Sequence, residues 1–371
     1  MPASGAIAFL ADFPPSDCLV PWRRLPLSDA VYSRTKRCLV GTLLTGFSDF
    51  EDNFQSMTSG PMISSDLLFG IIFLLQTGAG LLGNSSLLCL YLSFLLAGHK
   101  LKPVDRILNH LCAANTLVLL SKGIPQTVAA LGPKDFLGDM SCKLLFYFHR
   151  VARGTSLCTT CLLSCFQALT INSSAPRWAE LKRKASEHVV SSCFTCWLLN
   201  LLLQIVTILN VTGPRPDRNS TLDTRYVYCT SNFRQSLSIV LYALLLAAVE
   251  FAFIALMVWA SGAMMLTLSS HRQQVQHIQS KHFSHQSSPE TRATHTVLVM
   301  VIIFVSSYFL SSILAFYLAL IGKASARMYN VSTFVAACFP TCSSFVLISR
   351  FIQMSRLSFA WQMSKINFPK L

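Results

Sequence analysis

Charged residues are scarce in this chain. Only 12% of its 371 residues are Asp, Glu, Lys or Arg, which is about half the share that a soluble globular domain carries. Because a water-facing surface needs more charge than this, the composition argues against a soluble enzyme. Proline (15 residues) and glycine (16 residues) are not enriched, which excludes a collagen-like or low-complexity chain.

Apolar residues take the place of the missing charge. They make up 52% of the chain, and the mean hydropathy is +0.50. Lys and Arg outnumber Asp and Glu by 30 to 16, which gives a formal net charge of +14. In so apolar a chain, an excess of cations indicates loops biased toward one membrane face rather than nucleic-acid binding. The composition therefore predicts an integral membrane protein.

Seven apolar segments are candidates for membrane-spanning helices, each of which needs about 20 residues. Polar residues interrupt the second and third, and the segments that connect the seven are too short for folded domains. We therefore expect an all-α fold, a seven-transmembrane helix bundle. In chain order the segments are Leu67–Leu96, Ile107–Leu131, Met140–Ile171, Val189–Val211, Leu237–Leu268, Val297–Ile321 and Val331–Ile348.

The ends of the chain differ from the bundle, which we assign to residues 62–349. Residues 350–371 are expected to form a short cytoplasmic tail. Residues 1–61 combine proline, serine and scattered charges without the apolar core of a signal peptide, so we expect a flexible, disordered extension. Its cations lie on the side of the membrane that ought to be poor in them, which makes Met57 and Met62 alternative start sites.

The placement of Lys and Arg predicts the orientation of the bundle. With the amino terminus outside, fourteen of these residues fall in cytoplasmic segments and seven in external loops. This is the direction that the positive-inside rule requires. We therefore expect an extracellular amino terminus and a cytoplasmic carboxyl terminus.

Two cysteines fall on the external, oxidising side in this topology. Cys142 begins the third span, and Cys229 lies shortly before the fifth. A disulfide between them would tie the second external loop over the bundle, and two free thiols are the alternative. Three glycosylation sequons also lie outside or at that membrane edge, at Asn210, Asn219 and Asn330.

Charged side chains inside the spans are the candidates for a ligand cavity. A carboxylate at mid-bilayer costs at least about 2.5–3.5 kcal/mol, so it should face the bundle and find a partner. Glu250 lies about 20 Å along its helix, and Arg153 lies about 16 Å along the third. We hypothesise that these two pair while the shallower His149 and Arg150 face the ligand. A structural clamp without ligand contact is the alternative for the whole group.

Lys122 is a further cation in the outer half of the bundle, just before Pro125 in the second span. A long side chain at this depth can extend to the membrane interface. We favour that interpretation, and contact with a ligand is the alternative.

Catalytic and metal-binding patterns are absent from the sequence. It holds no G-x-S-x-G, H-E-x-x-H or Walker motif. The pairs Cys158/Cys161 and Cys193/Cys196 lie in apolar helices without polar neighbours, and four histidines within 271–285 lack an accompanying cysteine or carboxylate. We therefore expect no enzyme activity, no metal and no cofactor.

Six short strings follow one another over some three hundred residues. They are Ser121-Lys122-Gly123-Ile124-Pro125-Gln126-Thr127, Phe146-Tyr147-Phe148-His149-Arg150-Val151, Arg177-Trp178-Ala179-Glu180-Leu181-Lys182, Trp259-Ala260-Ser261-Gly262, Ser288-Pro289-Glu290-Thr291-Arg292-Ala293-Thr294 and Ala336-Ala337-Cys338-Phe339-Pro340-Thr341. Together they resemble the vomeronasal type-1 receptors, a family of G-protein-coupled chemosensory receptors, and this resemblance implies a rhodopsin-like receptor architecture. It runs from about Met62 to the carboxyl terminus. An Asp-Arg-Tyr triplet at the end of the third span and an Asn-Pro-x-x-Tyr motif in the seventh, both typical of other rhodopsin-like receptors, are absent.

The resemblance implies a plasma-membrane receptor for a small-molecule pheromone or odorant, coupled to a heterotrimeric G protein of the inhibitory type. Two positions depart from the family pattern, because Val249 and Ser344 stand where prolines are expected. A small-molecule transporter or channel, or a receptor-like product with little signalling, is the alternative.

The cytoplasmic face would then contact the G protein. Ser288, Pro289 and Glu290 are typical of a helix start, so the sixth helix is expected to begin in the cytoplasm before the membrane. Attraction to the anionic inner leaflet is the alternative role for the cations there. They are Arg177, Lys182, Arg183, Lys184 and Arg292.

Overall fold

The computed structural model of the protein describes nine segments of the chain: residues 65–98, 101–132, 136–171, 176–212, 224–225, 229–231, 237–278, 289–321 and 326–366. The expected extension over residues 1–61 lies outside the described residues, and so does Asn219. The backbone of the expected tail is described as far as residue 366.

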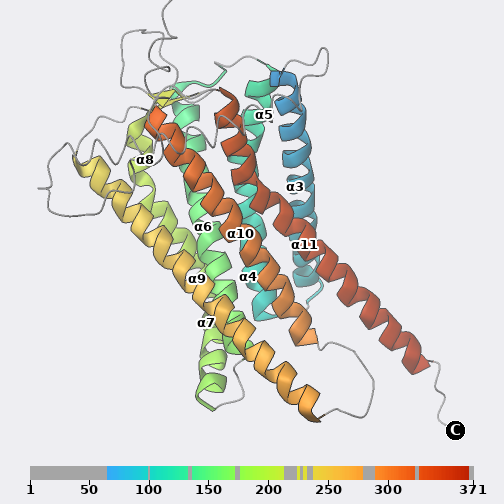
Figure 1. The fold of residues 1–371 in the computed structure, drawn as a ribbon. Coiled ribbons are helices and arrows are strands. Elements are labelled where there is room, and N and C mark those ends of the chain that lie inside the picture. The colour runs from blue at the N-terminus through green and yellow to red at the C-terminus, as the bar shows by residue number, and fades with distance from the viewer. Residues whose placement is uncertain are drawn as a thin grey trace, which may run out of the picture.

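Helices account for nearly all of the described chain, and they follow the seven apolar segments predicted from the sequence (Figure 1). Six stretches of helix are long and apolar enough to cross a membrane. The remaining segment is divided at Gln204 into two helices. The helices are α3 (Ser65–Leu96), α4 (Pro103–Val118), η2 (Leu119–Gly123), α5 (Ile124–Leu131), α6 (Asp139–Ile171), α7 (Pro176–Leu203), α8 (Ile205–Asn210), α9 (Leu237–Ile278), α10 (Pro289–Ile321) and α11 (Ala326–Ile366).

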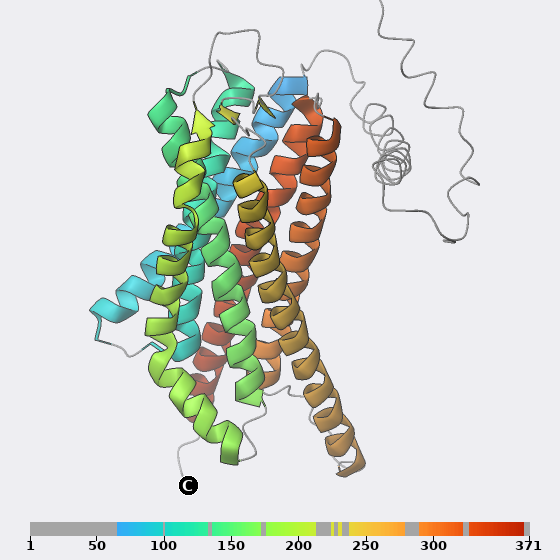
Figure 2. The ribbon, with the colours of Figure 1, turned by 90° about the vertical axis from the view of Figure 1, so that its left-hand side faces the viewer.

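The third span, α6, is the centre of the bundle. It packs against α4, α7, α9 and α10, whereas α11 packs against α3 and α10. Figure 2 shows the helices running side by side between two ends, with α9 projecting beyond its neighbours at one end, and Figure 1 shows the end of α11 projecting away from the bundle there. Ser156, Thr159, Thr160 and Ser164 of α6 are buried, as expected of the helix that the others surround.

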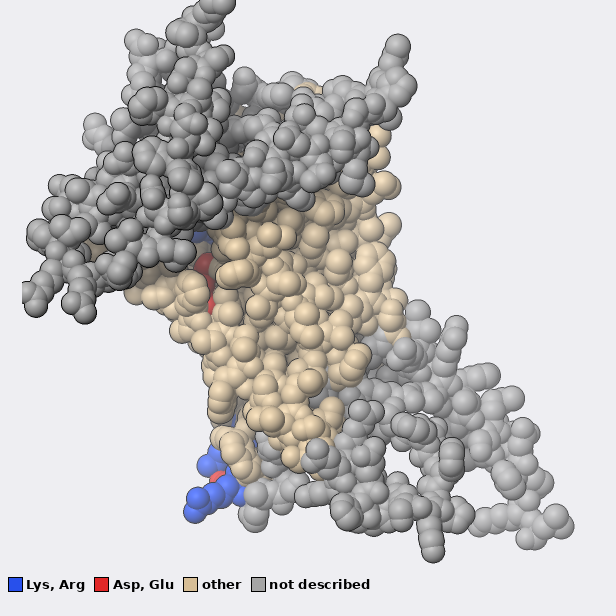
Figure 3. All heavy atoms as spheres, viewed as in Figure 1, with Lys and Arg blue, Asp and Glu red and all other residues tan. Residues whose placement is uncertain are grey.

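The outward surface of the bundle is apolar. Leu75, Leu82, Phe251 and Leu266 are among the large hydrophobic side chains that are more than half exposed. Figure 3 shows that the described surface across the middle of the bundle is almost free of charge, apart from a small acidic and basic area at its left edge, and that Lys and Arg gather at the end where α7 begins. An exposed apolar belt of this kind is expected where lipid, rather than water, surrounds the protein.

The second span contains an irregular turn. Between α4 and α5 the backbone widens into the π-helical turn η2, which includes Lys122 and Gly123. Pro125 follows at the start of α5 and has no N–H to donate to the preceding turn. Single π-turns occur frequently at functional sites, and this one changes the direction of the side chains that precede Pro125.

Proline residues also mark the sixth and seventh spans. Helix α10 begins at Pro289, before the apolar stretch that starts at His295, and this confirms the predicted helix start. Pro340 lies inside α11, and its carbonyl accepts a hydrogen bond from Asn84 Nδ2 at 2.9 Å. The turn of α11 around Pro340 is therefore hydrogen-bonded to α3.

Candidate functional site

A disulfide ties the loop before α9 to the start of α6. Cys142 and Cys229 form this predicted bond, with their Cα atoms 5.9 Å apart. Ala129 of α5 is buried against both cysteines, and Phe136 and Phe146 pack around them. Below, the end of the bundle that contains this bond is called the disulfide end.

A small antiparallel sheet accompanies the disulfide. Strand β3 (Thr230–Ser231), directly after Cys229, lies between β1 (Val211–Thr212) and β2 (Thr224–Arg225). Strand β1 contacts α6. The loop is therefore attached to the bundle by backbone pairing as well as by the disulfide.

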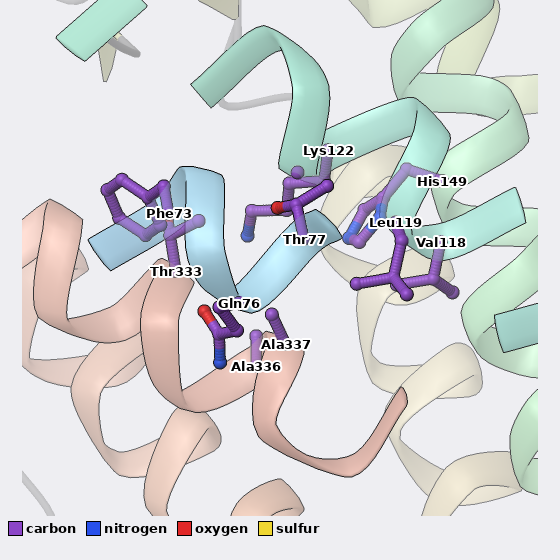
Figure 4. A pocket seen from close by; sticks show the side chains of 11 residues that line it. Phe73, Gln76, Thr77, Val118, Leu119, Lys122, His149, Thr333, Ala336 and Ala337 are labelled. Atoms are coloured by element: carbon purple, nitrogen blue, oxygen red, sulfur yellow. The ribbon is translucent and has the colours of Figure 1, made fainter. Parts of the chain in front are cut away.

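A cavity lies within the disulfide half of the bundle, between α3, the second span, α6 and α11. It is small, about 10 Å³, which is room for roughly one water molecule. Figure 4 shows Lys122 and His149 directed into the space beside Thr77. The apolar lining comes from Phe73, Val118, Leu119, Ala336 and Ala337, and the rest from Gln76, Thr77, Lys122, Gly123, His149 and Thr333.

Close backbone packing fixes the shape of the cavity beside Gly123. A Cβ atom at this position would lie 2.6 Å from Thr77 Oγ1 and 2.8 Å from Thr77 Cγ2. Only a residue without a side chain therefore permits η2 to approach α3 this closely. Because η2 and α3 pack this closely, Thr77 of α3 lies beside Lys122 of η2 (Figure 4).

Several polar atoms of the lining have no hydrogen-bond partner within the described part of the chain. They are Gln76 Oε1, Thr77 Oγ1, His149 Nδ1 and Thr333 Oγ1. Thr77 and Thr333 are only 5% and 2% exposed. Buried polar groups are nearly always hydrogen-bonded in folded proteins, so these four atoms need partners that the described chain does not supply. Four further atoms elsewhere in the core share this condition: Asn84 Oδ1, Gln126 Oε1, Thr155 Oγ1 and Ser261 Oγ.

Two threonines of the second span behave differently. The hydroxyls of Thr116 and Thr127 donate to the carbonyls of Cys112 and Gly123, each one helical turn earlier, at 2.8 Å. This is the ordinary solution for a threonine inside a helix. Thr77 and Thr333 do not adopt it, so their O–H groups remain available to a molecule in the cavity.

Positive charge surrounds the cavity. Arg150 and Arg153 lie close enough to Lys122 to repel its ammonium group, and all three also act on His149. Among the ion pairs of the described residues, none involves Lys122, whereas Lys143 pairs with Asp139 at 2.8 Å. Cationic side chains are therefore concentrated around the cavity.

The predicted direct pairing of Arg153 with Glu250 is wrong. Tyr308 of α10 lies between them: its hydroxyl donates to Glu250 Oε2, and the Arg153 guanidinium lies over its ring, 4.5 Å from the centroid. No Arg153–Glu250 ion pair occurs among the described residues. Tyr308 therefore separates the two charged groups and contacts both, one through a hydrogen bond and the other through a cation–π contact.

Of the four residues predicted to line a ligand cavity, only His149 lines this cavity. Arg150 is exposed, and Arg153 and Glu250 belong to the contact with Tyr308. Lys122, which the sequence favours at the membrane interface, lines the cavity instead. The direction of Lys122 was not predictable, because it depends on rotation about the helix axis and the π-turn changes that rotation.

A buried polar network lies deeper in the bundle than the cavity. Asn115 Nδ2 donates to Ser343 Oγ at 3.0 Å, and Ser156 Oγ donates to Asn115 Oδ1 at 2.9 Å. Asn115, Ser156 and Ser343 are each at most 3% exposed. One amide therefore joins α4, α6 and α11. Sequence reasoning missed this residue, because an asparagine in a span marks polarity but does not identify its partners.

Of the three expected glycosylation sites, only Asn330 has a side chain that the structure describes. Asn330 is 6% exposed in α11, and its Oδ1 accepts a hydrogen bond from Gln126 Nε2 at 2.7 Å. This buried amide does not suit a glycosylated residue. The side chain of Asn210, like the whole of Asn219, lies outside what the structure describes.

The predicted basic face lies at the end opposite the disulfide. Lys184 and Arg183 form pairs with Glu180 and Glu187 one turn away along α7, at 3.0 Å and 2.9 Å. Arg177 is exposed and Lys182 is half-buried. The side chain of Arg292 lies outside the described residues, although its backbone belongs to the first turn of α10.

Comparison with known proteins extends the resemblance noted from short strings. A sequence model described as the vomeronasal organ pheromone receptor family matches residues 67–360. Vomeronasal type-1 receptor 1 of Gorilla gorilla gorilla is 41% identical over 327 residues, covering 88% of this chain and 92% of the gorilla protein. Vomeronasal type-1 receptor 4 of Homo sapiens is 42% identical over 301 residues, covering 81% of this chain and all of that receptor. Olfactory receptor class A-like protein 1 of Danio rerio is 32% identical over 281 residues, covering 76% and 88% respectively.

Proposed function

Because the chain belongs to the vomeronasal type-1 receptor family, we propose that it is a chemosensory G-protein-coupled receptor whose cue is a small pheromone or odorant molecule. The observation that carries the proposal is the family match over residues 67–360, which falls on a helical bundle with the Cys142–Cys229 disulfide at one end. The receptor acts at the plasma membrane with the disulfide end outside. Family membership also supports a receptor without enzyme activity.

Signalling follows from the arrangement of the helices between the two ends of the bundle. A cue that binds the active bundle more tightly than the resting one shifts the population toward the active state. Gln76 of the lining donates to the Phe334 carbonyl at 3.0 Å, and Asn84 donates to the Pro340 carbonyl further along the same helix. A change at the disulfide end therefore alters contacts between α3 and α11 that continue toward the opposite end.

The partner at that opposite end is a heterotrimeric G protein of the inhibitory type. The exposed cations at the start of α7 lie there, as does the first turn of α10. Anionic lipid headgroups compete for the same charges. The face therefore consists of Arg177, Lys182, Arg183, Lys184 and Arg292.

Cells that express the tagged chain provide the test. The expected result is a cue-dependent fall in cyclic AMP for at least one member of a panel of volatile and steroid compounds, which disappears when the G protein is blocked by ADP-ribosylation. Uptake of a radiolabelled cue without signalling would instead identify a transporter. Surface labelling separates a receptor that signals weakly from one that does not reach the membrane.

A further inference from the structure

The cavity beside η2 brings polar side chains from four elements to one small space. Its volume of about 10 Å³ is close to the least that holds one water molecule. Figure 4 shows Lys122 and His149 directed into this space beside Thr77. A group bound here therefore contacts several elements at once. The polar side chains of the lining are Gln76 and Thr77 of α3, Lys122 of η2, His149 of α6 and Thr333 of α11.

The polar atoms around this space require a partner that both donates and accepts hydrogen bonds. Gln76 Oε1 only accepts, whereas the Lys122 ammonium only donates. The hydroxyls of Thr77 and Thr333 take either role, and His149 Nδ1 takes one or the other according to its tautomer. Apart from the ammonium, each of these atoms is buried without a hydrogen-bond partner in the described part of the chain. One small molecule that donates and accepts would serve them all in part.

Size and charge restrict the occupant to water. A metal cation is excluded because Lys122, with Arg150 and Arg153 close by, repels it. A halide ion has no hydrogen to donate to Gln76 Oε1. Organic molecules exceed the volume of the space. A buried water molecule fits it and makes about three hydrogen bonds, in both roles.

The place of η2 in the bundle gives such a water a structural role. Hydrogen bonds join the second span to α11 on both sides of η2. Gln126 Nε2 donates to Asn330 Oδ1 at 2.7 Å toward the disulfide end, and Asn115 Nδ2 donates to Ser343 Oγ at 3.0 Å further from it. Among the residues that the structure describes, the side-chain hydrogen bonds of η2 stay within its own span, from the hydroxyl of Ser121. A link at the level of η2 is therefore left to the cavity.

We propose that the cavity is a binding site for one ordered water molecule, which joins η2 to α3, α6 and α11. The water accepts from Lys122 Nζ and donates to Gln76 Oε1, and its remaining hydrogen bonds go to the threonine hydroxyls and His149. Apolar side chains close the space around it, with Phe73 and Leu119 only 5% and 0% exposed. This site goes beyond the proposed function and does not depend on it.

Radiolytic labelling detects such a water directly, because X-rays convert a bound water into a hydroxyl radical that oxidises the side chains touching it. The purified full chain in lipid nanodiscs is irradiated, and mass spectrometry of its peptides measures oxidation. Leu119 and Leu111 are both 0% exposed, and Phe73 and Phe166 are both 5% exposed, but only Leu119 and Phe73 line the cavity. We expect these two lining side chains to be oxidised several-fold faster than their controls.

Matched variants show whether the hydroxyls hold the water. Thr77→Val combined with Thr333→Val removes two hydrogen-bonding groups at nearly constant volume, and should slow oxidation of the lining side chains to the rate of their controls. Thr77→Ser keeps its hydroxyl and should retain fast oxidation. Thr116→Val, whose hydroxyl is bonded to the Cys112 carbonyl within its own helix, should also leave the rate unchanged.

The proposal is wrong if the lining side chains are oxidised no faster than their controls, since the cavity is then dry. Fast oxidation that persists in the double valine variant would contradict a site built from these hydroxyls. Replacing chloride by gluconate should change nothing, and faster oxidation after that exchange would identify a halide as the occupant. If the double variant does not fold, the comparison of Thr77→Val with Thr116→Val decides.

Discussion

Tyr308 determines how Glu250 is accommodated inside the bundle. Its hydroxyl donates to the carboxylate, and its ring accepts the Arg153 guanidinium on its face. Cation–π contacts of this kind contribute about 0.5–2 kcal/mol. One aromatic residue of α10 thereby links α6 and α9, which a direct ion pair would have joined without it.

Tyr308→Phe is expected to destabilise the receptor by about 1–3 kcal/mol, because it leaves the acid without its donor. Glu250→Gln should cost less, since the amide oxygen still accepts from Tyr308. The measurement is Tm of the purified variants. If Glu250→Gln and Arg153→Gln were both as damaging as Tyr308→Phe, a direct ion pair would explain the data better.

At this scale the sequence predicted depth but not direction. Counting residues along the helices correctly brought Arg153 and Glu250 to the same contact, since the rise per residue is constant. It could not identify Tyr308. Each residue turns the helix by about 100°, so a small error in the rotation of a helix about its axis changes which neighbouring helix a side chain faces. Lys122 was misplaced for the same reason.

The π-turn in the second span is the element that shapes the cavity. It brings Gly123 against Thr77 and includes Lys122. Gly123→Ala is expected to destabilise the protein by about 1–3 kcal/mol through overpacking, and to disturb the water site by displacing Thr77. Gly78→Ala is the matched control, because a Cβ there meets nothing within 4 Å.

Alanine at Gly78 should be neutral or stabilising by up to about 1 kcal/mol, since it favours the helix. Chemical or thermal unfolding of both variants measures the difference. An equal response of the two positions would show that the close approach of η2 to α3 does not matter for stability.

The helical segments were largely predictable from apolar length, because lipid permits few alternatives to a helix, and six of them are long and apolar enough to cross a membrane within the described chain. The division at Gln204 and the π-turn were not. Both are local departures from regular hydrogen bonding within segments that remain apolar, so hydropathy does not detect them. The start of α10 was predictable because serine, proline and an acid mark a helix terminus chemically.

For the whole molecule, the placement of charge predicts that the disulfide end faces outward. Glycosylation tests this orientation. Asn219→Gln is expected to remove the mass shift that an endoglycosidase produces on the wild-type chain, whereas Asn330→Gln should not remove it, because Asn330 is buried and bonded to Gln126. A glycan on Asn172, which lies beyond the opposite end of α6, would reverse the predicted topology.

Family membership was also within reach of the sequence, since six strings in order supported it before any longer match. The cavity was not. It depends on side chains from α3, η2, α6 and α11, and no single segment carries a signal for a space that four elements enclose. The unpaired hydroxyls of Thr77 and Thr333 become evident only when their neighbours are known.

Guanine-nucleotide exchange tests the central claim most directly. The full chain, reconstituted in nanodiscs with an inhibitory-type heterotrimer, should accelerate exchange when a cue from the panel of volatile and steroid compounds is added. Arg177→Gln combined with Lys182→Gln should reduce that acceleration without changing binding of the cue. A folded, cue-binding chain that leaves the exchange rate unchanged for every cue would contradict a signalling receptor.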